Sequence, residues 1–180
     1  MNINVHAGHN PSGKIACGAV GLLDESKENR RVVEYLIKYL KNYGHTVYDC
    51  TCNNGQSQND VLKKIVNKCN SRKKINLDIS IHFNSGAYDK KGNKKTTGTE
   101  VLVYRKNSKA LPYAKKIVKE ISELGFTNRG TKYNNSLYYL KHTAAPALLV
   151  ECCFVDDKDD AKLYDAKKMA KAIADAIGKA

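Results

Sequence analysis

A strand pattern followed by a helix pattern, between Ile3 and Leu40, most strongly limits the folds open to this chain. A short apolar run covers Asn2 to His6, and a loop rich in glycine follows it. The helix pattern then places apolar residues at a spacing typical of one buried helix face: Val32, Val33, Leu36, Ile37 and Leu40. Asp24 stands just before this segment, where its carboxylate can act as an N-cap.

The same alternation continues along the chain. Further strands are predicted at Thr46–Cys50, Leu77–Phe83, Thr99–Tyr104, Leu137–Leu140 and Ala147–Cys152. Helix patterns are centred on Val61–Cys69, Ala114–Leu124 and Ala166–Ile177, and loops are predicted at Gly86–Gly98 and Phe126–Asn135. Because strands that alternate with helices form parallel sheets, the sequence predicts an α/β fold. We expect a single domain, residues 1–180, with a mostly parallel, twisted sheet covered by helices on both faces.

The chain carries a formal net charge of +13, from 31 Lys and Arg against 18 Asp and Glu. Such an excess indicates an anionic partner, which can be a nucleic acid, a membrane surface or an acidic polymer, or it serves only solubility. The basic residues are spread widely, and the only aromatic pair near them is Tyr138–Tyr139. No nucleic-acid-binding signature is present, but a nucleic-acid-binding protein remains an alternative of a different class.

The six cysteines include no CxxC pair, which argues against a structural zinc knuckle. We expect all six to be reduced and most to be small core residues. No apolar run approaches the ~20 residues needed to span a bilayer. The N-terminus lacks the basic and apolar segments of a secretory signal, so we expect a chain that is made in the cytosol or that was supplied without its leader.

Four ionisable side chains stand at predicted strand ends or at a helix start: His9, Glu25, His82 and Glu151. The carboxyl ends of parallel strands meet at one edge of a sheet, so these side chains are expected to meet there. Two histidines and one carboxylate suit catalytic zinc, and a second carboxylate suits a general base. A purely structural interpretation of each residue stays open, although burying an unpaired Glu151 would be costly.

Glu25 and Glu28 both lie near the start of the first helix, so either could face the histidines. At about 100° per residue, the apolar face of that helix is centred about 50° from Glu25 and about 110° from Glu28. Helix geometry therefore favours Glu25 as the inward-pointing carboxylate, and we expect Glu28 to flank the cleft and face solvent.

The segments that carry these residues resemble a known family. HAGH at His6–His9, SIHFN at Ser80–Asn84 and PALLVE at Pro146–Glu151 are similar to motifs of zinc-dependent N-acetylmuramoyl-L-alanine amidases of the amidase-3 type. The resemblance is greatest to catalytic domains of clostridial phage endolysins, although that family usually has Asp where His6 stands.

This resemblance implies Zn²⁺ bound by His9, Glu25 and His82, with Glu151 as the catalytic acid and base. It implies cleavage of the amide between the lactyl group of N-acetylmuramic acid and L-alanine in peptidoglycan. A different zinc peptidase remains an alternative. An inactive wall-binding module is disfavoured, because all four site residues are present.

Three further residues are predicted to contact the substrate: Asn84, Arg129 and His142. Arg129 lies in a segment that resembles the family's Arg-Gly segment near the stem peptide, and His45 is expected to be exposed. The expected partners are peptidoglycan and anionic wall polymers, with no nucleic acid. The resemblance implies an enzyme made in the bacterial cytoplasm that acts on the wall after release.

Overall fold

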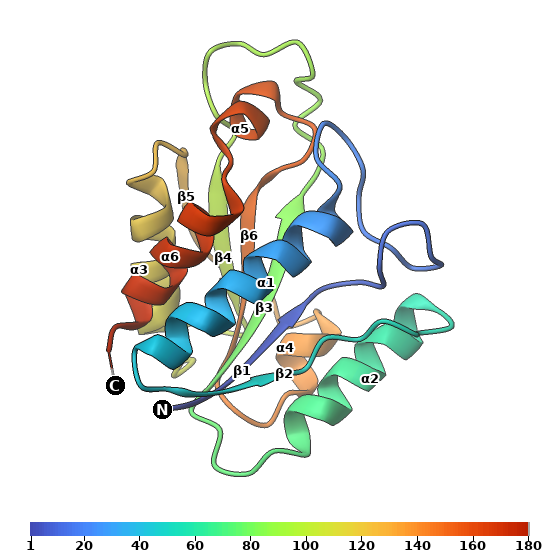
Figure 1. The fold of residues 1–180 in the computed structure, drawn as a ribbon, viewed down its shortest axis with the longest axis vertical. Helices are drawn as coiled ribbons and strands as arrows, with labels where there is room; N and C mark the ends of the chain where they lie inside the picture. Colours follow the sequence, from blue (N-terminus) through green and yellow to red (C-terminus); the bar gives the residue numbers. More distant parts are fainter. Residues whose placement is uncertain (180) are drawn as a thin grey trace.

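The computed structural model describes residues 1–179, and its strands form one six-stranded sheet with helices on both faces (Figure 1). Ala180, the last residue of the predicted domain, lies outside the described part. The elements follow in the order β1 (Asn2–Ala7), α1 (Glu25–Asn42), β2 (Thr46–Asp49), α2 (Gln58–Asn70), β3 (Leu77–Asn84), β4 (Thr99–Val103), α3 (Leu111–Ser122), β5 (Asn128–Tyr133), α4 (Tyr138–His142), β6 (Ala147–Phe154), α5 (Lys158–Leu163) and α6 (Ala166–Ile177).

The strands lie in the order β2-β1-β3-β6-β4-β5. All neighbouring pairs are parallel except β4 and β6, which run antiparallel. The predicted α/β class with a mostly parallel sheet is therefore confirmed. Because β1 and β6 both run parallel to β3, which lies between them, the carboxyl ends of the three strands lie at one edge of the sheet.

Two layers of helices cover the sheet. Helices α1, α3 and α6 pack on one face, and α2 and α4 pack on the other. Adjacent residues of a strand point to opposite faces of the sheet. In β6, Val150 belongs to the core beneath α1, α3 and α6, and Leu149 belongs to the core beneath α2 and α4. Leu36 of α1 is fully buried, which contributes about 1.5–3 kcal/mol for a side chain of this size.

The start of α1 is fixed by its cap. The Asp24 side chain accepts a hydrogen bond of 3.2 Å from the backbone N–H of Lys27, as the N-cap prediction requires. Glu25 is therefore the first residue of the helix. The apolar face predicted for this helix is buried against the sheet, which turns Glu25 inward as well.

Two predictions about the segment between α3 and β6 were wrong. Asn128–Tyr133, predicted as part of a loop, forms β5. This strand lies at the sheet edge with one neighbour, so its side chains are largely exposed and lack apolar alternation. Leu137–Leu140, predicted as a strand, lies at the start of α4, because a short apolar run does not distinguish a strand from a short buried helix.

His45 is buried rather than exposed, with 5% of its surface accessible. Its Nδ1 lies 3.2 Å from the amino group of Met1, and its Nε2 lies 2.7 Å from the carbonyl oxygen of Gly178. These partners are far from His45 in the sequence, which is why the prediction failed.

Five of the six cysteines are buried and Cys17 is half-buried, which confirms that most are core residues. None of the six forms a disulfide within the described chain. No helix among residues 1–179 is long and apolar enough to cross a membrane.

Candidate metal centre

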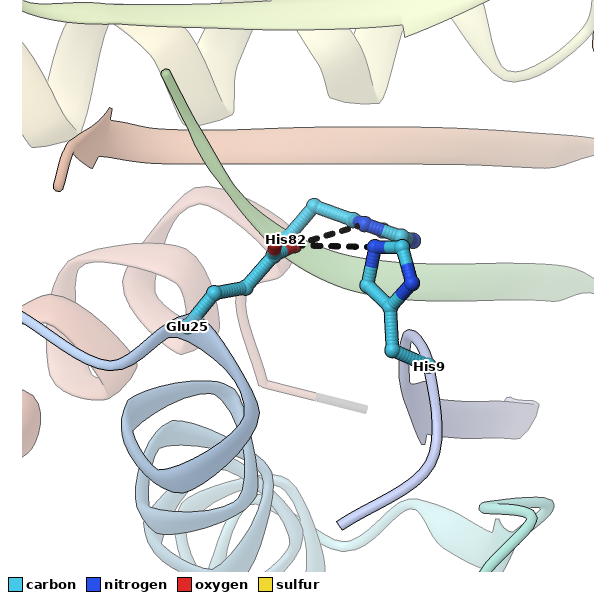
Figure 2. A group of neighbouring side chains, drawn as sticks. All are labelled: His9, Glu25 and His82. Carbon is cyan, nitrogen blue, oxygen red and sulfur yellow. Dashed lines mark hydrogen bonds and ion pairs between the residues drawn. The ribbon is translucent and has the colours of Figure 1, made fainter. Parts of the chain in front are cut away.

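His9, Glu25 and His82 come together at the carboxyl edge of the sheet. Figure 2 shows the three side chains pointing toward one another, from the loop after β1, the start of α1 and the end of β3. Among residues 1–179, they form the one group of three or more potential ligands whose donor atoms all lie within 4.8 Å. The predicted juxtaposition of these residues is therefore present in the structure.

The distances in this triad suit a tetrahedral metal ion. Oε1 of Glu25 lies 3.3 Å from Nε2 of His9 and 3.0 Å from Nδ1 of His82. Two ligand atoms bound at about 2.0–2.1 Å in a tetrahedral site lie about 3.3 Å apart. Two imidazoles and one carboxylate are also a donor set of catalytic zinc sites, so these residues fit Zn²⁺.

Two glycines leave room for the triad. A Cβ atom at Gly8 would lie 2.1 Å from the imidazole of His82, and one at Gly18 would lie 2.4 Å from the carboxylate of Glu25. Contacts this short are not tolerated, so any larger residue at either position would displace a triad side chain. The loop after β1 is thus shaped around the site.

The Glu25 carboxylate is oriented by backbone donors. Its Oε1 accepts a hydrogen bond of 3.2 Å from the N–H of Phe83, and its Oε2 accepts one of 2.9 Å from the N–H of Ala19. Such outer partners fix the direction of a ligand and are typical of metal sites.

Helix α1 also holds the turn that carries His9. Asn29 donates a hydrogen bond of 2.9 Å to the carbonyl oxygen of Gly8, and Arg30 donates one of 2.9 Å to that of His9. These contacts support a φ of 62° at His9, a left-handed conformation that a non-glycine residue seldom adopts without support. No local sequence pattern marks Asn29 or Arg30, since their partners are backbone atoms about twenty residues away.

The contacts within the triad shift the pKa values of Glu25 and His9. Burial alone would raise the pKa of Glu25, but its contacts with His82 and His9 hold that pKa well below its ordinary range. Burial disfavours the charged form of His9, but the hydrogen bond and charge of Glu25 outweigh it and raise the pKa of His9. Glu25 is therefore an ionised, nearly buried carboxylate, which suits it to a cation.

Glu151 lies next to the triad on β6, in register with His82 of β3 and Glu100 of β4. Burial, helped by the charges of Glu25 and Glu100, raises the pKa of Glu151 to about 8. Its Oε2 is buried and has no hydrogen-bond partner among the described residues. A carboxyl group that changes protonation near neutral pH beside a cation site is suited to proton transfer.

Comparison with known proteins identifies the family. Residues 3–180 match the family model described as N-acetylmuramoyl-L-alanine amidase. The chain belongs to this amidase family.

The relatives agree with this assignment. An uncharacterized protein of Clostridium perfringens is 40% identical over 181 residues, which cover 98% of this chain and 51% of that protein. The catalytic domain of the CD27L endolysin targeting Clostridia Difficile superposes with a TM-score of 0.85 at 28% identity, covering 98% of this chain and 96% of that one. The catalytic domain of CwlV, an amidase from Bacillus (Paenibacillus) polymyxa, gives a TM-score of 0.76 at 26% identity, covering 98% and 95%. The chain spans about half the length of the two clostridial relatives that match it over most of its sequence.

Two of the three predicted substrate-contacting residues of this amidase-family chain lie together. Asn84 Nδ2 donates a hydrogen bond of 3.2 Å to one carboxylate oxygen of Glu100, and Arg129 Nε donates one of 3.0 Å to the other. Glu100 stands opposite Glu151 on the neighbouring strand, so Asn84 and Arg129 are held near the Glu151 carboxyl. Glu100 was missed, although a lone acid in the apolar segment TEVLV is a visible signal.

The structure does not bring His142 to the site. It is exposed at the end of α4, where its ring packs on Tyr138 with ring centroids 4.3 Å apart. Tyr138 lines the pocket beside the triad, but His142 does not. The predicted substrate contact of His142 therefore has no support in this geometry.

Proposed function

We propose that this chain hydrolyses the amide between the lactyl group of N-acetylmuramic acid and L-alanine in peptidoglycan. The observation that carries the proposal is the triad of His9, Glu25 and His82 with the unpaired carboxyl of Glu151 beside it, in a member of the amidase family. The family supports the substrate, and the geometry supports the division of chemical roles.

In this proposal His9, Glu25 and His82 hold Zn²⁺. When bound, the ion supplies a Lewis acid that polarises the scissile carbonyl and makes water more acidic. Gly8 and Gly18 keep space for the ligands, while Asn29 and Arg30 hold the turn that presents His9.

Glu151 transfers the proton. Its carboxylate accepts a proton from the water that attacks the carbonyl carbon, and it returns that proton to the alanine nitrogen as the C–N bond breaks. The products are the lactyl carboxylic acid and the free amine of L-alanine. Burial raises the pKa of Glu151 in the metal-free chain, which brings the protonated form within reach near neutral pH, as one group serving as base and then acid requires.

Arg129 of β5 and Asn84 at the end of β3 are proposed to bind the substrate near Glu100 of β4, which both of them contact. Glu100 accepts from Nε of Arg129, and the guanidinium packs over the ring of Phe154 at 5.0 Å. This arrangement holds the guanidinium in one orientation, with its terminal N–H groups suited to a carboxylate of the stem peptide.

The net charge of +13 suits attraction to anionic wall polymers, with no nucleic acid as a partner. We propose that the chain acts on the cell wall after release from the bacterial cytoplasm.

Digestion of purified cell walls tests the reaction. New free amino groups should appear on L-alanine, without new reducing sugar ends. Reducing ends would indicate a glycosidase, and free amino groups on other residues would indicate a peptidase.

Glu151→Gln is the matching variant. It should lower the rate about 10²–10⁴-fold, because general acid–base groups contribute factors of this size. It should retain zinc, as measured by metal analysis of the purified protein. A variant that lost its metal would place Glu151 among the ligands instead.

A further inference from the structure

His9 directs one ring nitrogen at the triad and leaves the other for a partner outside it. Its Nε2 lies 3.3 Å from Oε1 of Glu25, and Figure 2 shows the second ring nitrogen turned away from that carboxylate. This second nitrogen, Nδ1, is buried and has no hydrogen-bond partner of normal geometry among residues 1–179. A neutral imidazole that binds a metal through one nitrogen carries a proton on the other, so Nδ1 needs an acceptor.

The segment that leads into α2 is fixed against the turn that carries His9. The side-chain amide of Asn10 donates a hydrogen bond of 2.7 Å to the carbonyl oxygen of Gly55 and accepts one of 3.0 Å from the Gly55 N–H. Nη2 of Arg30 donates to the carbonyl oxygens of both His9 and Cys52, at 2.9 Å and 3.1 Å. Asn10 is fully buried, so these contacts hold the start of α2 beside His9.

Gln58 is the first residue of α2, three positions after Gly55. The Ser57 hydroxyl accepts a hydrogen bond of 3.2 Å from the N–H of Asp60, and this cap fixes where the helix begins. Gln58 and His9 both line the pocket of about 320 Å³ beside the triad. The side-chain amide of Gln58 is therefore placed next to the imidazole of His9.

Gln58 contacts this imidazole as an acceptor. Burial lowers the pKa of His9, and hydrogen bonds to Glu25 and, more weakly, to Gln58 raise it. An amide raises the pKa of an imidazole when its oxygen accepts from a ring N–H, because this contact stabilises the protonated ring. Since Nε2 is directed at Glu25, Nδ1 is the nitrogen left for Gln58. The terminal torsion of a glutamine is broad, so the amide can turn to normal geometry without moving the helix.

We propose that Gln58 is a positioning residue of the metal centre, whose Oε1 accepts the Nδ1–H proton of His9 and leaves the Nε2 lone pair for zinc. The proposal rests on the proposed function, which supplies the metal. Gln58 acts through His9 and touches neither the ion nor the substrate in this role. The contact fixes the tautomer and the orientation of the ring and makes Nε2 a better donor.

Zinc affinity, measured by competition with a chromogenic chelator, tests the proposal. Gln58→Leu keeps a side chain of similar size and removes the acceptor, so it should weaken zinc binding about 10–100-fold, as the loss of such outer partners does. Gln56→Leu is the matched control, because Gln56 is exposed and lies outside the pocket. Unchanged zinc affinity in Gln58→Leu would overturn the proposal.

Gln58→Glu distinguishes an acceptor from a merely structural side chain. A carboxylate is the stronger acceptor for an imidazole N–H, so this variant should bind zinc at least as tightly as the wild-type chain. If Gln58→Glu lost as much affinity as Gln58→Leu, the start of α2 rather than the acceptor would matter, and the proposal would be wrong.

NMR reports the state of the His9 ring directly. Long-range proton–nitrogen spectra of the zinc-loaded, nitrogen-15-labelled chain should show His9 protonated at Nδ1, with a proton that exchanges slowly with water. The exchange should become faster in Gln58→Leu and stay slow in Gln56→Leu. A proton on Nε2 of His9 in the wild-type chain would overturn the proposal even if Gln58→Leu did not fold.

These measurements use no substrate, so their outcome is separate from that of the proposed function. Wall digestion without amidase products, together with the expected zinc affinities, would count against the proposed function alone. Amidase products together with unchanged zinc affinity in Gln58→Leu would count against the role of Gln58 alone.

Discussion

Glu25 and Glu28 are three residues apart on α1, yet they have different surroundings. Glu25 is 3% exposed and lies within 3.3 Å of both histidines. Glu28 instead forms a 2.8 Å ion pair with Arg31, and 15% of its side chain is accessible. Glu28 is thus only partly exposed to solvent, where full exposure was predicted.

This difference makes a matched pair of variants informative. Glu25→Ala should lose bound zinc and activity, because it removes the one carboxylate that contacts both imidazoles. Glu28→Ala should keep most of both. Zinc content and wall digestion measured on the two purified proteins decide between the glutamates, and the reverse pattern would assign the metal to Glu28.

A buried carboxyl away from the triad gives a pH-dependent contribution to stability. Asp78 of β3 is 1% exposed, and neither of its carboxylate oxygens has a hydrogen-bond partner of normal geometry among the described residues. Burial raises its pKa from 3.8 to about 6. Between these values the folded protein binds more protons than the unfolded one, so stability falls as pH rises through about 6.

Asp78→Asn should therefore stabilise the metal-free protein above pH 6 and have little effect near pH 4. The gain is at most about 3 kcal/mol, since a tenfold change in ionisation is worth about 1.4 kcal/mol. Urea denaturation from pH 4 to pH 8 measures it, with Asp49→Asn at an exposed position as control. A gain that does not vary with pH would contradict this account.

At the scale of elements, the loop between β1 and α1 determines the shape of the metal centre. Its glycines serve different purposes. Gly18 gives space for the Glu25 carboxylate, whereas Gly13 has a φ of 78°, and a Cβ atom added there would meet no other atom within 4 Å. The loop can therefore be changed at one glycine without disturbing the site.

Gly18→Ala should lower zinc affinity about 10–100-fold, the range typical when the groups that orient a ligand are perturbed. Gly13→Ala should cost about 1–2 kcal/mol of stability, because alanine is strained in the left-handed region, but it should leave zinc affinity unchanged. Metal titration and thermal denaturation of both variants separate the two effects. Equal zinc affinities would mean that the Glu25 side chain moves aside without cost.

At the scale of the whole molecule, the charge of +13 is distributed over many surface positions. If it concentrates the enzyme on anionic wall polymers, activity on whole walls should fall as salt rises, because screening shortens to about 10 Å at 0.1 M salt. Hydrolysis of a short, soluble substrate should change much less. A rate on whole walls that stays flat with salt would remove this role for the charge.

The sequence was sufficient for the features that depend on local pattern and strand direction. The alternation of strand and helix periods predicted the α/β class, and the helix period alone predicted that Glu25 points inward. His9 and His82 could be paired because neighbouring parallel strands end at one sheet edge.

Only the tertiary structure decided features that depend on partners distant along the chain. The edge strand β5 carries no apolar alternation, and His45 is buried by Met1 and Gly178 from the two ends of the described chain. Glu100 joins the site because Asn84 and Arg129, which are distant from it along the chain, both donate hydrogen bonds to its carboxylate. The pocket beside the triad exists because α2 and α4 lie over four strands, β1, β3, β4 and β6, an arrangement that no local period encodes.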